Sequence, residues 1–267
     1  MKLLKIVQSL EALSNEDRLD CILTYLKEFD VPYQIQDYHT GANVWTESAK
    51  KPYIGISSHF DVVPNSPGAN DNASAIAVCL EIIRRYKNSE FSNFGLQVYF
   101  FDEEETGLKG SKAYVEEYGI DHLLGLINME LVGMGDQFAL WPLTNHDYGK
   151  ILQCFEQVAD GRKLKARRFD KIVTNTADHV SFREAGLEDV FTITCISDRD
   201  LEVAQHYYKA MEFEVDVSTL KSILRDAPLF EHYHQPTDLA QHLSEASLEM
   251  TANTIWETLI NLDNRRY

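Results

Sequence analysis

Runs of apolar, strand-forming residues alternate along the chain with segments in which apolar residues recur at helical spacing. This alternation favours a sheet covered by helices over an all-helical or all-strand fold. We therefore expect an α/β fold, a three-layer α/β/α sandwich with a mostly parallel mixed central sheet, in a single domain over residues 1–267. The expected strands cover residues 31–38, 43–47, 52–61, 95–101, 122–130, 138–143 and 189–197, and the expected helices cover two segments within 2–29 and residues 73–87, 110–119, 147–159 and 244–264.

An excess of acidic residues limits the partners that the protein can bind. The chain has 42 Asp and Glu against 25 Lys and Arg, a formal net charge of -17. This charge repels phosphates, which argues against a nucleic acid or an anionic membrane as partner. The basic cluster at residues 162–171 is interpreted as a solvated surface.

The cysteines and the first residues of the chain suggest a reduced, cytoplasmic protein. The cysteines, Cys21, Cys79, Cys154 and Cys195, form no CxxC pair and sit in apolar stretches. This pattern predicts neither a disulfide framework nor a cysteine metal site. The first residues lack the continuous apolar core of a signal peptide, and no run reaches the length of a membrane span.

Polar residues gather where three of the expected strands end. His59 and Asp61 end one strand, the acidic run 102–105 (DEEE) follows another, and Glu130 ends a third. In open α/β sheets, ligands bind outside the carboxyl ends of the strands, so these groups could converge. Four adjacent carboxylates repel one another, so the run is either a solvated loop or a site that faces cations.

Each candidate residue also has an ordinary structural interpretation. His59 could be a buried histidine, Asp71 in GANDNASA could cap the helix that follows, and His234 in YHQPTD could be a loop histidine before a proline turn. A hydrolytic metal site, in contrast, needs neutral imidazoles together with ionised carboxylates. Taken singly, the motifs leave both interpretations open.

Taken in order, the motifs HFD, PGANDNASA, FFDEEETGLKGS, NMELVG, TADHVSF and YHQPTD match a known pattern. From residue 52 onward the chain resembles the di-zinc aminopeptidases of the bacterial leucyl aminopeptidase type, whose relatives include glutaminyl cyclases and glutamate carboxypeptidases. The resemblance implies two zinc ions per chain. By position, it implies that His59 and Glu130 hold one ion, that Glu105 and His234 hold the other, and that Asp71 bridges the two.

The same resemblance implies roles for residues around the ligands. Glu104 matches the general base, Asp61 the partner that orients a histidine ligand, and Tyr233 a tyrosine that helps polarise the substrate carbonyl. Asp178 and His179 match residues that line the pocket or support the ligands, and a purely structural role is the alternative.

The chain departs from the family pattern at two positions. Glu130 stands where the family usually has Asp, which adds one methylene to a proposed ligand, and Ala75 stands where it often has Gly. The Asp71–Asn72 peptide bond is expected to be cis, as it is in the family.

The implied function is that of a zinc-dependent aminopeptidase. A water molecule activated by metal, with a glutamate as general base, would hydrolyse the N-terminal residue from peptides that have a free N-terminus. The alternatives are a glutaminyl cyclase-type acyltransferase and a non-catalytic metal-binding relative. A carboxypeptidase would need cations around the carboxylate of its substrate, and the basic cluster at 162–171 is a poor candidate.

Overall fold

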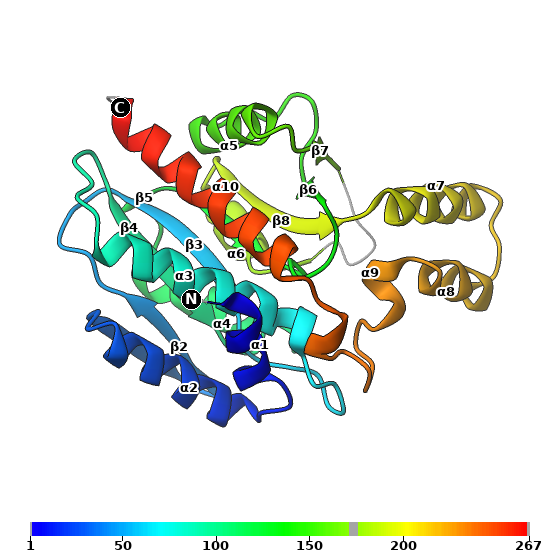
Figure 1. Cartoon of the computed structure of the whole chain (residues 1–267), viewed down its shortest axis with the longest axis horizontal. Coiled ribbons are helices and arrows are strands. Elements are labelled where there is room, and N and C mark those ends of the chain that lie inside the picture. Colours follow the sequence, from blue (N-terminus) through cyan, green and yellow to red (C-terminus); the bar gives the residue numbers. More distant parts are fainter. Residues whose placement is uncertain (1, 171–175, 266–267) are drawn as a thin grey trace.

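The computed structural model describes residues 2–170 and 176–265, which contain an eight-stranded sheet. The order across the sheet is β1-β2-β4-β3-β5-β8-β6-β7 (Figure 1). The strands are β1 (Tyr33–Tyr38), β2 (Gly41–Thr46), β3 (Tyr53–His59), β4 (Gly95–Phe101), β5 (Leu123–Met129), β6 (Gln137–Trp141), β7 (Ala166–Arg168) and β8 (Val190–Ile196).

The middle of the sheet is parallel, and antiparallel pairs flank it. Strand β3 lies between β4 and β5 and runs parallel to both, and β5 runs parallel to β8. The pairs β1–β2, β2–β4 and β6–β8 are antiparallel, whereas β6 and β7 are parallel. The predicted mixed, mostly parallel sheet is confirmed.

Helices cover both faces of the sheet (Figure 1). Helices α3, α5 and α10 share one hydrophobic core with a face of the sheet, and α4 and α6 share another core with the opposite face. The helices are α1 (Leu3–Leu10), α2 (Asn15–Glu28), α3 (Ser74–Lys87), α4 (Lys109–Tyr118), α5 (Lys150–Gly161), α6 (His179–Glu184), α7 (Asp198–Glu212), α8 (Val217–Arg225), α9 (Pro228–Glu231) and α10 (Glu245–Asn264), with the shorter η1 (Ala69–Ala73) and η2 (Ala240–His242).

The side chains of the central strands alternate between these two cores. In β3, Ile54 and Ile56 pack into the core beneath α3, whereas Tyr53 packs into the core beneath α4. In β4, Tyr99 and Phe101 likewise face α4, whereas Val98 and Phe100 face α3. Because successive side chains of a strand point to opposite faces, a strand that is apolar throughout requires a layer on each side.

The strands predicted from the sequence are all present, with ends shifted by at most two residues, and the ends of the predicted helices are correct to within three residues. No element had been predicted for β7, for α6 or for the segment from α7 to α9. Part of the basic cluster 162–171 forms the short edge strand β7, and residue 171 lies outside the described residues.

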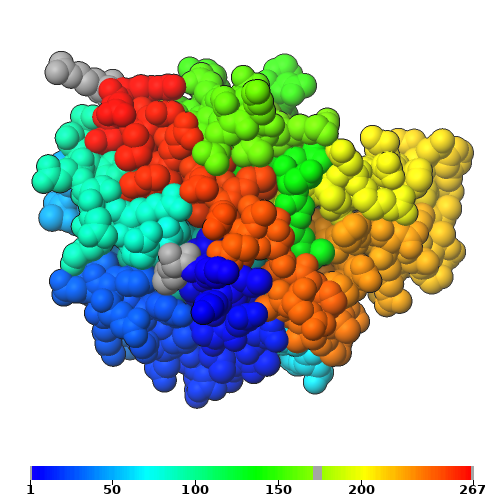
Figure 2. Space-filling model, viewed as in Figure 1, coloured from blue at the N-terminus to red at the C-terminus, as the bar shows by residue number. Residues whose placement is uncertain are grey.

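A helical hairpin of α7 and α8 projects from the body of the molecule, between β8 and α9 (Figures 1 and 2, yellow to orange). Helix α8 buries none of its residues, and Phe213 between the two helices is 72% exposed. The helices are defined locally instead, since Ser197 caps α7 in a capping box and Asp216 caps α8.

Within the described residues, no helix is both long enough and apolar enough to cross a membrane. The cytoplasmic location and the single-domain organisation stay predictions.

One carboxylate joins the start of the last helix to the start of the first, which gives a test of stability. Both oxygens of Glu245 in α10 accept hydrogen bonds of 2.8 Å from the first backbone N–H groups of α1, those of Leu3 and Leu4. We expect Glu245→Ala to lower the free energy of unfolding by about 1–2 kcal/mol, because these N–H groups have no intrahelical partner. Denaturant titration measures the change. Glu249→Ala, an exposed change on the same helix, is the control, and equal stability of the two variants would contradict the assignment.

Candidate metal centre

Three neighbouring parallel strands deliver polar side chains to one edge of the sheet. Strand β3 ends at His59, β4 is followed by the acidic run 102–105, and β5 is followed by Glu130. His59 pairs in register with Phe101, so the first residues after β4 lie beside it. The convergence expected from the strand ends is therefore present.

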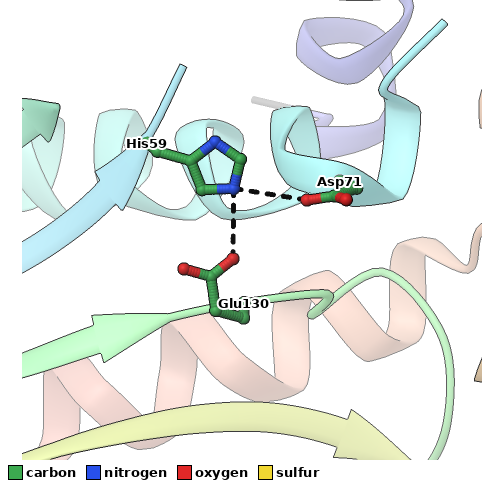
Figure 3. A group of neighbouring side chains, drawn as sticks. All are labelled: His59, Asp71 and Glu130. Carbon is green, nitrogen blue, oxygen red and sulfur yellow. Dashed lines mark ion pairs between the residues drawn. The ribbon is translucent and has the colours of Figure 1, made fainter. Parts of the chain in front are cut away.

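His59, Asp71 and Glu130 form the first part of the cluster (Figure 3). His59 Nε2 lies 3.2 Å from Asp71 Oδ1 and 3.2 Å from Glu130 Oε2. All three residues are buried. Burial opposes a charge on the His59 ring, but the surrounding carboxylates, Glu130 first, raise the pKa of His59 well above its ordinary value.

His234, Asp71 and Glu105 form the second part. His234 Nε2 lies 3.1 Å from Asp71 Oδ2 and 3.2 Å from Glu105 Oε2. Asp71 therefore turns one oxygen to each histidine. Burial alone would raise the pKa of Asp71, but the His234 and His59 imidazoles hold it below its ordinary value. The structure thus brings all five predicted ligands together, in the two groups implied by the resemblance.

Several buried atoms of this cluster lack a hydrogen-bond partner among the described residues. They are Asp71 Oδ2, Glu105 Oε1 and His234 Nε2. The His234–Asp71 contact is short but is not aligned as a hydrogen bond. Buried polar atoms are rarely left unpaired, and imidazole nitrogens with carboxylate oxygens are the donor set that zinc prefers. The residues fit zinc.

Asp61 contacts both His59 of the first group and the backbone at Glu105 of the second group. Its carboxylate lies 3.2 Å from His59 Nδ1. It also accepts hydrogen bonds from the backbone N–H groups of Glu104 (3.0 Å) and Glu105 (3.1 Å). A carboxylate on the far nitrogen of a metal-binding histidine fixes the ring orientation. Asp61 therefore lies where it can orient His59, and its hydrogen bonds hold the acidic run in place.

Asp71 is not the helix cap that its sequence context allowed. Helix α3 begins after Ala73, and no side chain caps it. The Asp71–Asn72 peptide bond is cis, as expected. The backbone N–H groups of Asn70 and Asp71 donate to the carboxylate of Asp238 at 2.8 and 3.1 Å. Asp238 ends the motif YHQPTD, but its hydrogen bonds to the backbone at Asp71 were not predicted from the sequence.

Two asparagines hold Glu130, and neither was singled out from the sequence. Asn72 Nδ2 donates to Glu130 Oε2 at 2.8 Å, and Asn128 Nδ2 donates to Oε1 at 3.1 Å. Asn128 is held in turn by the Ser57 hydroxyl at 2.7 Å. The longer side chain of Glu130 therefore has a donor for each oxygen and still reaches His59.

Glu104 and Tyr233 lie beside the cluster. They line a cavity of ≈ 270 Å³ together with His59, Asp71, Glu105 and Glu130. Burial raises the pKa of Glu104 well above its ordinary value, although His59 opposes the shift. Burial, with the nearby carboxylates, also raises the pKa of the Tyr233 phenol, so it is a hydrogen-bond donor at neutral pH.

Asp178 and His179 lie close to the site in different ways. Both oxygens of Asp178 are buried without a hydrogen-bond partner among the described residues, and burial raises its pKa to about 7. His179 points to Thr192, with Nδ1 2.7 Å from the hydroxyl, and packs edgewise on Trp141. His179 supports the core beside the site. The Asp178 carboxylate is close enough to Glu104 to help raise the pKa of Glu104.

A second pocket lies between the sheet and helix α7 of the projecting hairpin. It has a volume of ≈ 480 Å³ and is bounded by β6, β8, α7 and α9. Phe230 of its lining lies edge-to-face with Tyr233, at 5.6 Å between ring centroids. The lining is largely apolar: Ala139, Phe169, Thr194, Ile196, Asp200, Leu201, Ala204, Tyr208, Leu229 and Phe230.

The model of peptidase family M28 matches residues 42–259. The chain belongs to this family. It is 29% identical over 207 residues to a probable lipoprotein aminopeptidase, LpqL, of Mycobacterium tuberculosis, which covers 73% of this chain and 39% of that protein. It is 29% identical over 172 residues to the aminopeptidase YwaD of Bacillus subtilis, which covers 61% of this chain and 36% of that protein. The chain thus spans less than half the length of these relatives.

Solved structures share the fold. A zinc aminopeptidase from Bacillus subtilis superposes with a TM-score of 0.64 at 22% identity, over 83% of this chain and 50% of that one. A glutaminyl cyclase from Porphyromonas gingivalis superposes with a TM-score of 0.73 at 17% identity, over 98% of this chain and 97% of that one. The α/β fold is thus that of the family.

The two asparagine contacts predict that Glu130 suits this site better than the aspartate usual in the family. Glu130→Asp withdraws the carboxylate by one methylene, so it cannot keep both asparagines and the place beside His59. We expect zinc binding to weaken about tenfold or more. Competition with a chromophoric chelator measures the change. Glu103→Asp, in the acidic run 102–105 and ion-paired to Lys109, is the control. Zinc affinity equal to wild type in Glu130→Asp would show that the asparagines do not set the ligand position.

Proposed function

We propose that the protein is a zinc-dependent aminopeptidase that removes N-terminal residues from peptides. The observation that carries this proposal is the position of Asp71 between two histidine–carboxylate pairs, since one aspartate shared by two ligand sets is suited to two metal ions. Membership of a peptidase family and the aminopeptidases among the relatives support hydrolysis of peptides.

Glu104 is the proposed general base. It lines the same cavity as the ligands without being needed in either ligand set. Its carboxylate would take a proton from the attacking water and return it to the leaving amine. The Asp61 carboxylate, by holding the N–H groups of Glu104 and Glu105, fixes the base relative to the neighbouring ligand.

Tyr233 is the proposed donor to the substrate carbonyl oxygen. Its neutral phenol supplies a hydrogen bond as negative charge develops on that oxygen. Zinc ions, when bound, would supply Lewis acidity and positive charge, which favour the ionised forms of a water and of the surrounding carboxylates. The concentration of carboxylates also favours a substrate that brings a positive charge, such as a peptide N-terminal ammonium.

A glutaminyl cyclase is the second candidate, because a cyclase structure superposes over nearly the whole chain. In such a reaction the α-amine of an N-terminal glutamine attacks its own side-chain amide and releases ammonia. The present donor set favours the hydrolase, since both histidines and the shared aspartate are in place for two ions.

Zinc analysis and a substrate screen test the proposal together. We expect about two zinc ions per chain and hydrolysis of aminoacyl amides and peptides, abolished by a chelator and restored by zinc. The control is the same peptides with an acetylated N-terminus, which should remain intact. Cyclisation of glutaminyl peptides without hydrolysis would favour the cyclase. Zinc binding without either reaction would favour a non-catalytic relative.

Substitutions at the two adjacent glutamates separate the base from the ligand. Glu104→Gln keeps the shape but removes the proton acceptor, so turnover should fall roughly 10²–10⁴-fold while zinc content stays near wild type. Glu105→Gln should weaken one zinc site and lose activity that added zinc partly restores. Steady-state kinetics and metal analysis on both variants give the readout. If the two phenotypes were exchanged, the roles along the acidic run would be shifted by one residue.

A further inference from the structure

Arg18 of helix α2 is a fully buried cation close enough to Asp71 for their charges to interact. It lies on α2 with Ile22 and Leu26 at intervals of four residues, and all three side chains are buried. This face of an amphipathic helix normally carries apolar residues. Burying a guanidinium is costly unless its donors are satisfied, so its contacts should account for its presence.

The Arg18 guanidinium binds the segment that connects β3 with η1. Nη2 donates to the carbonyl oxygens of Pro67 (2.7 Å) and Gly68 (2.9 Å), and Nη1 donates to that of Phe60 (3.4 Å). The hydrogen bonds found for it in the described part of the chain all go to backbone carbonyls, none to a carboxylate. The planar guanidinium can bridge carbonyls at both ends of the segment, whereas a lysine presents a single donor group.

The proposed ligands His59 and Asp71 flank this segment directly, one before Phe60 and the other after η1 begins. The segment has little freedom on the Arg18 side. Gly68 has φ 64°, and a Cβ there would lie 2.5 Å from Arg18 Nη2. The backbone and the guanidinium therefore pack in direct contact.

A second residue of α2 holds the same segment. The Asn15 side-chain oxygen accepts a hydrogen bond of 3.2 Å from the backbone N–H of Val62. Helix α2 thus holds the segment at its beginning, through Phe60 and Val62, and at its end, through Gly68. A displacement of α2 would change the distance between His59 and Asp71.

The charge of Arg18 offers a different explanation of its burial. Burial lowers the pKa of Arg18, while the neighbouring carboxylates of Asp71, Asp238 and Asp61 favour its charged form. As a counter-charge alone, Arg18 would stabilise the metal-free carboxylates and oppose a second cation nearby. The two roles predict opposite effects of its removal on zinc affinity.

We propose that Arg18 is a positioning residue of the metal centre, which fixes the segment 60–68 and thereby the separation of His59 and Asp71. The inference rests on the zinc site proposed above. It extends the site beyond the residues of the family match, 42–259, to a helix that precedes them. Asp71 must present one oxygen to each histidine, so a small shift of this segment disturbs both groups at once.

Two substitutions separate geometry from charge. Arg18→Lys keeps the charge but loses the bridging contacts, and Arg18→Met removes both. We expect each to weaken zinc binding about tenfold or more, in line with other residues that support metal ligands. Competition with a chromophoric chelator on the full chain, well below the melting temperature of the zinc-free protein, measures it. Arg168→Met is the matched control: Arg168 also donates to backbone carbonyls, those of Thr144 and Asp147, but lies on β7.

Other outcomes would overturn the inference. Tighter zinc binding by Arg18→Met, with Arg18→Lys like wild type, would assign Arg18 the role of a counter-charge. A lower melting temperature with unchanged zinc affinity would make it merely structural. If Arg18→Met fails to fold, Arg18→Lys and Asn15→Ala carry the test, and unchanged affinity in both refutes the inference. Absence of zinc binding by the wild-type chain would instead refute the proposed zinc centre, and this inference with it.

Discussion

Negative charge concentrated at one edge of the sheet is the constraint on which the rest of the site depends. The parallel arrangement of β3, β4 and β5 places the polar residues that follow each strand at the same edge. Asp61, Asp71 and Glu130 are buried there, beside Glu104 and Glu105. Buried carboxylates are costly unless paired, so the arrangement requires positive charge in the same place. The histidines and Arg18 supply part of it, and Asp71 Oδ2 and Glu105 Oε1 are left without a hydrogen-bond partner among the described residues.

The strand ends alone provide three of the five candidate ligands. Asp71 lies in η1, and His234 lies in the segment after α9, far along the chain. Asp238, four residues after His234, accepts hydrogen bonds from the backbone of Asn70 and Asp71. The loop that carries the second histidine therefore also holds the shared aspartate. A displacement of this loop would therefore move both His234 and Asp71.

Much of the fold could be predicted because its strands are apolar throughout and its helices are periodic, as in β4 and α3. The five ligand positions could be predicted because their motifs occur in a recognisable order and lie at strand ends or in turns. The supporting residues could not. Asn72, Asp238 and Arg18 act on backbone groups or side chains that only the tertiary structure brings near. Asn72 and Asp238 lie in the motifs GANDNASA and YHQPTD, but the motifs do not show which groups these side chains contact. Helices α7 and α8 escaped prediction because they bury few residues and are defined by their caps instead.

The metal cluster and the region around α7 and α9 differ in how their residues are held in place. The ligands lie on a sheet edge where each neighbour is fixed by a charge or a hydrogen bond, so a change at one position disturbs several others. In the pocket wall formed by α7 and α9, one contact joins the two helices and another joins α9 to Tyr233. Asp200 of α7 accepts the backbone N–H of Leu229 at 2.8 Å, and Phe230 packs against Tyr233. Helix α7, which buries few of its residues, thus borders a pocket that adjoins the metal cluster through Phe230 and Tyr233, so a change in this wall reaches the candidate site through Tyr233.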